Sequence, residues 1–445
     1  MKEMTWNCPH IKTNNLIDHG RLEVLMNPFL YRGKKLYCES VALDDITNKV
    51  GTPAYVYSKN GIADNFVKID HAFEGIPHRI CYAFKANSAP HILRLLAELG
   101  AGADVVSGGE LQLALENGFS PKKIVFAGVG KTDPEIELAI EKDILAINVE
   151  SRQELKIVAE IAARMNKVAP IAIRINPDID IEGHPYLTTG KQANKFGIGL
   201  EEAIAGFQWA AQQKSLRIVG VHNHLGSMIT KSLPYTKSAE TLANLVLDLK
   251  RQGIHLEHID LGGGIGVDYH RVLADDGDPF TVDPRVIAEQ TLPVLKKTGC
   301  EILMEPGRAI VGPNGALLST VLYRKVTKGK TFIIVDAAMN DLLRPSLYGA
   351  YHAILPVSKS GKGVEEIVDV VGPVCESGDF LAQNRELMPL DRGDLVAVMT
   401  AGAYGYTLAS NYNTRPRPVE VWVDEEHFEV IRERETLFKD MSCRG

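Results

Sequence analysis

Lys85 is the first residue whose surroundings suit covalent chemistry. It directly follows the apolar run Arg79–Phe84 and precedes Ala86. A lysine among apolar neighbours can lose its proton by desolvation and form a Schiff base with a carbonyl compound. Taken alone, Lys85 is better interpreted as a solvated lysine at the end of a strand, so its meaning depends on the residues that share its location.

Two glycine-containing segments suit the binding of a phosphorylated ring. Gly262–Gly264 is a glycine triplet, and residues without Cβ let backbone N–H groups approach an anion. The G-x-G-x-x-G spacing of dinucleotide-binding loops is absent, and a simple tight turn is the alternative. In Glu305–Arg308 (EPGR) the carboxylate could keep the ring nitrogen of pyridoxal phosphate protonated, and Ser227 could add a phosphate donor. An exposed ion pair of little consequence is the other interpretation.

The pair His222 and His224 alternates, so both rings share one face of a strand. Core histidines, a metal-binding pair and a ring stacked on a cofactor remain open. A metal is disfavoured because no third ligand with suitable spacing accompanies the pair, and we expect none.

Cys375 and Glu376 follow the turn Gly372-Pro373. A buried structural cysteine is the common fate of a free thiol. Beside an acidic residue and a turn, Cys375 is also a plausible proton donor.

Short apolar runs alternate with helical stretches over the first two thirds of the chain. Continuously apolar runs are typical of parallel strands that are buried on both faces. Eight such units predict a (β/α)8 barrel of the TIM type, in which chemistry lies at the C-terminal ends of the strands. A doubly wound open sheet is the competing topology. The eight runs are 79–84, 103–106, 123–127, 145–149, 171–175, 218–224, 258–261 and 301–305.

The pattern changes after about residue 312, where strand-like runs are separated by turns containing Gly, Pro and Asp. The stretch before residue 50 is similar. We therefore expect a barrel over residues 50–312 and a β-rich domain, resembling a sandwich or barrel, built from residues 1–49 and 313–445.

Composition narrows the functional classes. The chain has 445 residues, with 49 Lys and Arg against 56 Asp and Glu, a net charge of −7. This charge disfavours nucleic-acid binding, which depends on neutralising phosphates. No apolar run reaches the roughly 18–20 residues of a membrane span, and the first residues lack the apolar core of a secretory signal. Six scattered cysteines form no disulfide or zinc pattern. We expect a cytoplasmic protein with no membrane and no nucleic-acid partner.

Eight segments together resemble the pyridoxal-phosphate-dependent fold-type III decarboxylases, and within them the branch that acts on meso-2,6-diaminopimelate. Their order and spacing also agree, and they span residues of about 55 to 415. They are Tyr82–Ser88, Asp104–Leu111, His184–Gly199, His222–Ser227, Leu261–Gly266, Glu305–Val311, Gly372–Asp379 and Gly402–Asn413.

The resemblance implies a cofactor site. Lys85 would carry pyridoxal 5'-phosphate as a Schiff base, His224 would stack on its ring and Glu305 would pair with the ring nitrogen. The residues that would hold the phosphate end are Ser227, Gly264, Pro306, Gly307, Arg308 and Tyr404.

The resemblance also implies a shared catalytic site. Cys375 would protonate the carbanion left by decarboxylation, and it would come from the second subunit of a homodimer. The residues that would contact the far end of the substrate are Arg308, Arg344, Tyr348, Glu376 and Tyr404. Arginines for a distal carboxylate and an acid for a distal amine fit meso-2,6-diaminopimelate, which would yield L-lysine and CO2.

Other functions remain open at this stage. A related decarboxylase could act on ornithine, lysine or another amino acid. A racemase would have no obvious use for Arg344 and Glu376, and a catalytically silent relative would be expected to have lost Lys85 or Cys375. A metal-dependent barrel hydrolase lacks the ligand set.

Overall fold

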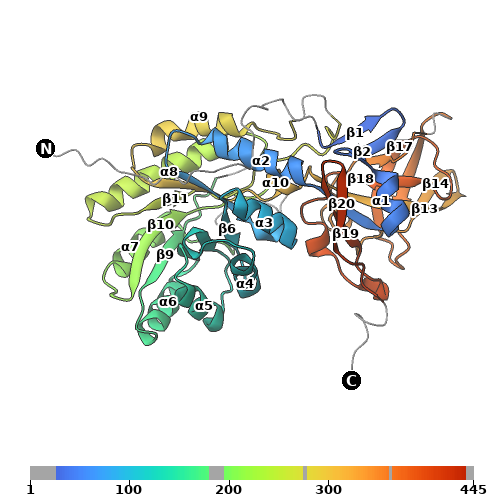
Figure 1. Ribbon diagram of the computed structural model, residues 1–445. Coiled ribbons are helices and arrows are strands. Elements are labelled where there is room, and N and C mark those ends of the chain that lie inside the picture. The colour runs from blue at the N-terminus through green and yellow to red at the C-terminus, as the bar shows by residue number, and fades with distance from the viewer. Residues whose placement is uncertain (1–26, 180–194, 274–277, 360–362, 437–445) are drawn as a thin grey trace, which may run out of the picture.

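The computed structural model describes residues 27–179, 195–273, 278–359 and 363–436 (Figure 1). Most of the segment 184–199, which carries part of the family resemblance, lies outside these residues. No described helix is both long enough and apolar enough to cross a membrane.

Eight parallel strands form a closed barrel on one side of the molecule (Figure 1). The barrel closes where its last strand, β12, pairs with its first strand, β5. In this pairing Ile302, Leu303 and Met304 lie opposite His78, Arg79 and Ile80. Closure confirms the expected barrel and excludes the open sheet. The strands are β5 (His78–Ala83), β6 (Gly102–Val105), β7 (Ile124–Phe126), β8 (Ala146–Val149), β9 (Ala169–Arg174), β10 (Leu216–His222), β11 (His258–Asp260) and β12 (Glu301–Met304).

Helices cover the outside of the barrel (Figure 1), and serine residues cap the N-termini of two of them. Ser107 accepts a hydrogen bond from the Glu110 backbone, and Ser151 does the same for Glu154. The pair Asp133-Pro134 predicts Asp133 as the N-cap of a helix with proline in its first turn. This prediction is wrong by one residue, because the Thr132 hydroxyl and Glu135 form the capping box. The helices are α2 (Lys59–Ala72), α3 (Pro90–Glu98), α4 (Gly108–Glu116), α5 (Asp133–Lys142), α6 (Arg152–Arg164), α7 (Leu200–Ala210), α8 (Leu233–Arg251) and α9 (Pro284–Leu295).

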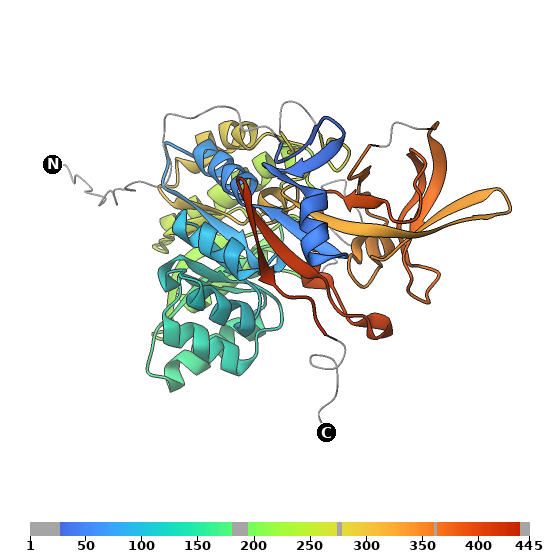
Figure 2. The same ribbon diagram turned by 45° about the vertical axis from the view of Figure 1, so that its right-hand side comes forward.

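A nine-stranded sheet forms the core of the β-rich part, in the order β17-β16-β14-β13-β4-β19-β20; β18 also pairs with β13, and β15 pairs with β18. Figure 2 shows the β13–β14 hairpin extending away from the barrel. The strands are β4 (Ala54–Ser58), β13 (Gly315–Thr327), β14 (Lys330–Val335), β15 (Ile354–Pro356), β16 (Glu366–Val371), β17 (Phe380–Leu387), β18 (Leu395–Val398), β19 (Val419–Asp424) and β20 (His427–Arg432).

The N-terminal part joins this sheet, as expected for a domain made from both chain ends. A small sheet of β1 (Phe29–Arg32), β2 (Lys35–Cys38) and β3 (Val41–Ala42) precedes α1 (Leu43–Val50). Its apolar residues share one core cluster with β13 and β19. The strand β4 also pairs with β13 and β19, although the expected barrel range 50–312 includes it. The domain bounds themselves stay a prediction.

A loop of the β-rich part packs against the turn that carries Lys85. The Tyr404 backbone N–H donates to the Ala86 carbonyl at 2.8 Å, and the Asn87 amide donates to the Gly402 carbonyl at 2.9 Å. Tyr404 has a φ of 55°, a left-handed conformation that costs a non-glycine residue about 1 kcal/mol or more. The strain is held by these contacts, so the two parts of the chain together fix the geometry beside Lys85.

Gly402→Ala tests this contact. A Cβ on Gly402 would overlap the carbonyl oxygen of Val311, and neither backbone can move without breaking the loop. We expect the free energy of unfolding to fall by about 3 kcal/mol, as in an overpacked core. Denaturant unfolding measures it. Gly130→Ala is the matched control, because its Cβ would meet nothing within 4 Å and its φ is not positive. Equal stability of the two variants would show that the loop is not tightly held.

Candidate active site

A pocket lies at the C-terminal ends of the barrel strands, where the fold predicts chemistry. The sequence-predicted residues Lys85, His224, Ser227, Gly264, Glu305, Gly307, Arg308 and Tyr404 all line it, together with Ala83 and Ile265. Of the predicted cofactor residues only Pro306 is not part of the lining, and its carbonyl accepts a hydrogen bond from the Ala83 backbone.

Lys85 lies in the short 3-10 turn η1 (Phe84–Ala86) that ends β5. Its Nζ forms an ion pair with Oδ2 of Asp104 at 2.5 Å, and the Asp104 side chain is fully buried on the adjacent strand β6. Burial lowers the pKa of the Lys85 ammonium, but Asp104 and Glu305 outweigh burial and raise the pKa above its ordinary value. Lys85 is therefore charged in this state, and Asp104 stands beside it as a proton acceptor.

Glu305 lies directly after β12 and contacts two histidines. Nε2 of His222 lies 3.3 Å from Oε2 of Glu305, and Nδ1 of His224 lies 4.0 Å from the same oxygen. The Gly263 N–H donates to Nδ1 of His224 at 3.1 Å, so this nitrogen carries no proton. Burial, then the charge of Lys85, lowers the pKa of His224 well below its usual value. His224 is thus a neutral ring beside a pocket, which suits stacking.

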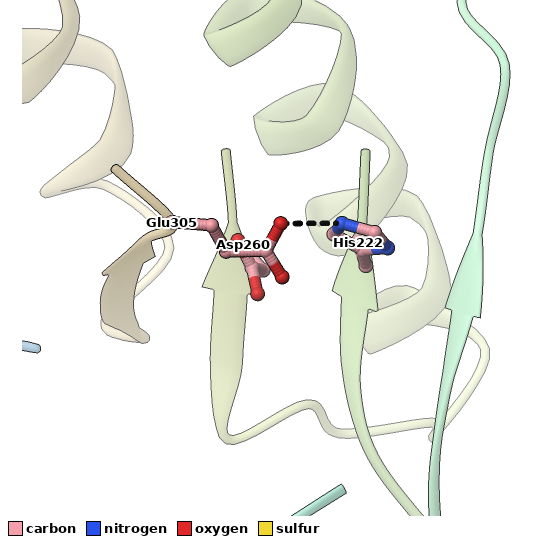
Figure 3. Close-up of side chains that lie close together, drawn as sticks. All are labelled: His222, Asp260 and Glu305. Atoms are coloured by element: carbon pink, nitrogen blue, oxygen red, sulfur yellow. Dashed lines mark hydrogen bonds and ion pairs between the residues drawn. The ribbon is translucent and has the colours of Figure 1, made fainter. Parts of the chain in front are cut away.

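A second carboxyl group, Asp260, completes this buried cluster (Figure 3). Side-chain atoms of His222, Asp260 and Glu305 that could bind a metal lie within 4.8 Å of one another, so the fold brings two carboxyl groups to His222 that sequence spacing does not reveal. However, Nε2 of His222 and Oε2 of Glu305 already contact each other. The cluster is therefore a hydrogen-bonded network as it stands.

The two carboxyl groups of the cluster differ in charge. Burial raises the pKa of Asp260 well above its ordinary value, and the neighbouring Glu305 raises it further. Burial also disfavours the charge on Glu305, but His222 and Lys85 hold its pKa below the usual range. Glu305 is therefore ionised, and Asp260 carries a proton, because like charges this close cannot both ionise.

The glycine triplet forms a close backbone cradle. Gly264 has a φ of 97°, and a Cβ there would overlap the Gly226 carbonyl oxygen. Beside it, Nη2 of Arg308 donates to Oγ of Ser227 at 3.1 Å. Backbone N–H groups, a hydroxyl and a guanidinium group suit a phosphate, and the ionised Glu305 with its buried, unpaired Oε1 suits a protonated ring nitrogen. These residues fit pyridoxal phosphate.

Two buried arginines form the other end of the site. Arg308 opens the short helix α10 (Arg308–Val311), and Arg344 opens α11 (Arg344–Tyr348) in the β-rich part. Tyr269 joins them, since its hydroxyl accepts from Nη1 of Arg308 at 2.6 Å and its ring centre lies 4.7 Å from Cζ of Arg344. Both arginines are less than a tenth exposed, and in the described part of the chain neither forms an ion pair. Buried cations without a carboxylate partner favour an anionic ligand.

Cys375 and Glu376 are not among the residues that line this pocket. Both are exposed, and the Cys375 backbone N–H donates to Oδ1 of Asn413 at 2.8 Å. Tyr348 lies on α11 with Arg344. The pocket of one chain is therefore lined by every predicted cofactor residue except Pro306, but not by the predicted proton donor.

Four residues of the site were missed as functional candidates from sequence alone. Asp104 and Asp260 each interrupt an otherwise apolar strand, and a carboxyl group within such a run is a detectable signal. Tyr269 carried no such signal, and neither did His352, a fully buried residue whose Nε2 lies 2.7 Å from Nη1 of Arg344. Aromatic residues and lone histidines are common in cores.

A second cavity of about 480 Å³ lies between the β1–β2 hairpin, α2 and the loop around Asp268. It is larger than the barrel-mouth pocket, but none of the predicted catalytic or cofactor residues lines it. Chemistry, rather than size, therefore identifies the site.

Comparisons with known proteins agree with this chemistry. Residues 59–312 match the family model described as pyridoxal-dependent decarboxylase, pyridoxal binding domain. The chain is 46% identical over 411 residues to the diaminopimelate decarboxylase of Aquifex aeolicus, covering 92% of this chain and 96% of the relative. It is 45% identical to that of Pseudomonas aeruginosa, covering 93% and 97%.

Solved structures give the same result. The diaminopimelate decarboxylase of Helicobacter pylori complexed with L-lysine has a TM-score of 0.84 and 43% identity, covering 89% of this chain and 97% of that chain. The enzyme from M. jannaschii in complex with L-lysine has a TM-score of 0.87 and 35% identity, covering 94% and 99%.

The different charges of Asp260 and Glu305 predict different effects of neutral substitutions. Asp260→Asn keeps an uncharged group that can donate a hydrogen bond, so we expect the dissociation constant for pyridoxal phosphate to change by less than about 3-fold. Glu305→Gln removes the only charge of the pair and is expected to weaken binding about 30-fold, as for loss of a buried charge partner. Titration of the cofactor by absorbance measures both. Similar losses in the two variants would show that the charges are not assigned correctly.

Proposed function

Because the chain belongs to the diaminopimelate decarboxylase family of pyridoxal-dependent decarboxylases, we propose that it removes CO2 from meso-2,6-diaminopimelate and releases L-lysine. The observation that supports this substrate is the pair of buried guanidinium groups of Arg308 and Arg344, which have no carboxylate partner among the residues that the structure describes. An ornithine substrate has only an ammonium group at its far end. That positive group would face the buried, positively charged guanidinium groups. Diaminopimelate brings a carboxylate to that end.

The cofactor end follows from the residues of the barrel mouth. Bound pyridoxal phosphate supplies the electron sink for the charge left at Cα when CO2 departs. Lys85 would hold the cofactor through Nζ, and Oδ2 of Asp104 is placed to take the proton that Nζ must lose before it can act as a nucleophile. Glu305 would keep the ring nitrogen protonated, and the neutral His224 would stack on the ring. Asp260 retains its own proton, so it does not compete with Glu305 for that role.

The phosphate end is bound by the glycine cradle and its neighbours. Backbone N–H groups near Gly264, the hydroxyl groups of Ser227 and Tyr404, and Arg308 supply the donors, while Pro306 and Gly307 keep the backbone close to the cofactor. The Arg308 guanidinium lies between Ser227 and Tyr269, so it can also face the substrate. Arg344, Tyr348 and Tyr404 complete the far end.

We propose that the site is completed by a second copy of the chain. Cys375 and Glu376 are exposed and absent from the pocket lining of their own chain, which supports their use in the pocket of a partner. Cys375 would protonate the carbanion, and Glu376 would bind the distal ammonium group. The buried free thiols Cys38, Cys81 and Cys300 support a reducing, cytoplasmic setting.

The experiment that tests the proposed function compares substrates. Purified protein with pyridoxal phosphate is given meso-diaminopimelate, L-ornithine, L-lysine or L-arginine, and released CO2 is measured. We expect release from diaminopimelate alone. Release from ornithine or lysine instead would keep the reaction type and overturn the substrate.

Lys85→Ala is expected to abolish turnover and the absorbance of cofactor bound through Nζ, since Lys85 is the only lysine among the described residues that line the pocket. The loss should exceed about 10³-fold, as for removal of a covalent catalyst. The matched control is Lys131→Ala, a buried lysine that pairs with Glu154 at 2.8 Å and does not line the pocket. Normal turnover in Lys85→Ala would contradict the cofactor assignment.

Cys375→Ala is expected to bind the cofactor normally but to form product at least about 10²-fold more slowly, since a positioned proton donor contributes that much. If the site is shared, a mixture of the Lys85→Ala and Cys375→Ala chains regains activity, because each mixed dimer holds one intact site. Random mixing predicts about a quarter of the wild-type rate for a two-fold dimer. No recovery after co-expression would show that each chain uses its own cysteine.

A further inference from the structure

Arg344 is held by a histidine rather than by a carboxylate. Its Nη1 lies 2.7 Å from Nε2 of His352, and Nδ1 of His352 lies 2.8 Å from the Met399 carbonyl oxygen. A carbonyl oxygen can only accept, so Nδ1 carries the proton and Nε2 offers a lone pair to the arginine. His352 is fully buried. Burial, with the charge of Arg344 beside it, lowers the pKa of His352 well below its usual value, so the ring is neutral.

Tyr269 links His352 to both arginines. Its hydroxyl accepts from Arg308, its ring lies below the guanidinium group of Arg344, and the rings of Tyr269 and His352 meet edge to face at 5.2 Å. Each of these partners is uncharged. Burial raises the pKa of the Tyr269 phenol, but Arg308 and Arg344 outweigh burial and lower the pKa below its usual value.

The type of hydrogen-bond partner decides whether the positive charge of Arg344 stays available to a ligand. A carboxylate would hold Arg344 equally well but would neutralise it, and a neutralised arginine attracts an anionic ligand weakly. A neutral acceptor fixes the direction of the guanidinium group and leaves its positive charge in place. Burying two such cations side by side is unfavourable, and Arg308 and burial lower the pKa of Arg344. A ligand that supplies a negative charge would offset the free-energy cost of burying the guanidinium groups of Arg308 and Arg344 together.

We propose that Tyr269 and His352 are positioning residues that hold Arg308 and Arg344 through neutral contacts, so that both guanidinium charges select a carboxylate at the far end of the substrate. This inference rests on the proposed function and assigns the selectivity of that site to two residues that do not themselves bind the substrate.

Two substitutions at position 352 distinguish the orientation of the Arg344 guanidinium group from its net charge. His352→Gln offers an uncharged amide oxygen to Arg344, and His352→Glu offers a carboxylate of nearly the same size. The probes are L-lysine, which keeps the distal carboxylate of diaminopimelate, and cadaverine, which has the same chain length without it. Dissociation constants for both are measured by calorimetry on the holoenzyme, with kcat and KM for diaminopimelate alongside.

We expect the wild-type protein to prefer L-lysine to cadaverine. His352→Gln should keep this preference within about 3-fold, whereas His352→Glu should reduce it about 30-fold and raise KM for diaminopimelate more than it lowers kcat. An unchanged preference in His352→Glu, or an equal loss in His352→Gln, would overturn the inference. If the wild-type protein releases no CO2 from diaminopimelate, the proposed function and this inference both fail; normal wild-type turnover with matching Gln and Glu variants rejects the inference alone.

Tyr269→Phe keeps the inference testable if glutamate at position 352 prevents folding. It removes the oxygen that accepts from Arg308 but keeps the ring beside Arg344 and His352. We expect a reduced preference for L-lysine over cadaverine and an increased KM. Tyr351→Phe is the control, because Tyr351 stacks on His270 outside this cluster. Equal preference in both tyrosine variants would contradict a role for Tyr269.

Discussion

The arrangement of buried charge at the barrel mouth is the constraint on which the rest of the structure depends. At one end, Lys85 neutralises Asp104, and His222 partners Glu305. At the other end, Arg308 and Arg344 have only neutral partners among the described residues. A buried charge without a counter-charge costs several kcal/mol in free energy. These two guanidinium groups would gain a counter-charge from a ligand with an anionic group, which is the physical basis of the selectivity proposed above.

The barrel and the β-rich part together position these buried charged groups. Parallel barrel strands bring Asp104, His222, Asp260 and Glu305 to one end without long flexible segments, because residues at strand ends lie side by side. The β-rich part contributes Arg344 and His352 and fixes Tyr404 against the Lys85 turn. Neither part contains the whole pocket, so the packing between them is a requirement for chemistry as well as for stability.

Much of the fold and the cofactor pocket could be predicted from the sequence. Continuous apolar runs predicted the barrel strands within one or two residues, and strand-end reasoning brought Lys85, Glu305 and the glycine triplet together. The strand β4 was missed as part of the β-rich sheet, because a single buried strand looks the same in either domain. The cap of α5 was misplaced because Thr132 and Asp133 are both good capping residues and only the backbone decides between them.

Other features depend on three-dimensional packing that spacing cannot reveal. The proton on Asp260 follows from its closeness to Glu305, which is 45 residues away in sequence. The neutral contacts made by Tyr269 and His352 depend on two loops from different parts of the chain. The exposure of Cys375 could not be read from its neighbours, since most free cysteines are buried.

The most direct test is a crystal structure of the holoenzyme with bound L-lysine. We expect the lysine carboxylate to contact Arg344, whose guanidinium group stays hydrogen-bonded to His352, and Cys375 of a second copy to reach the pocket. A lysine carboxylate placed away from both arginines would contradict it, because the buried guanidinium charges would then have no ligand to explain them.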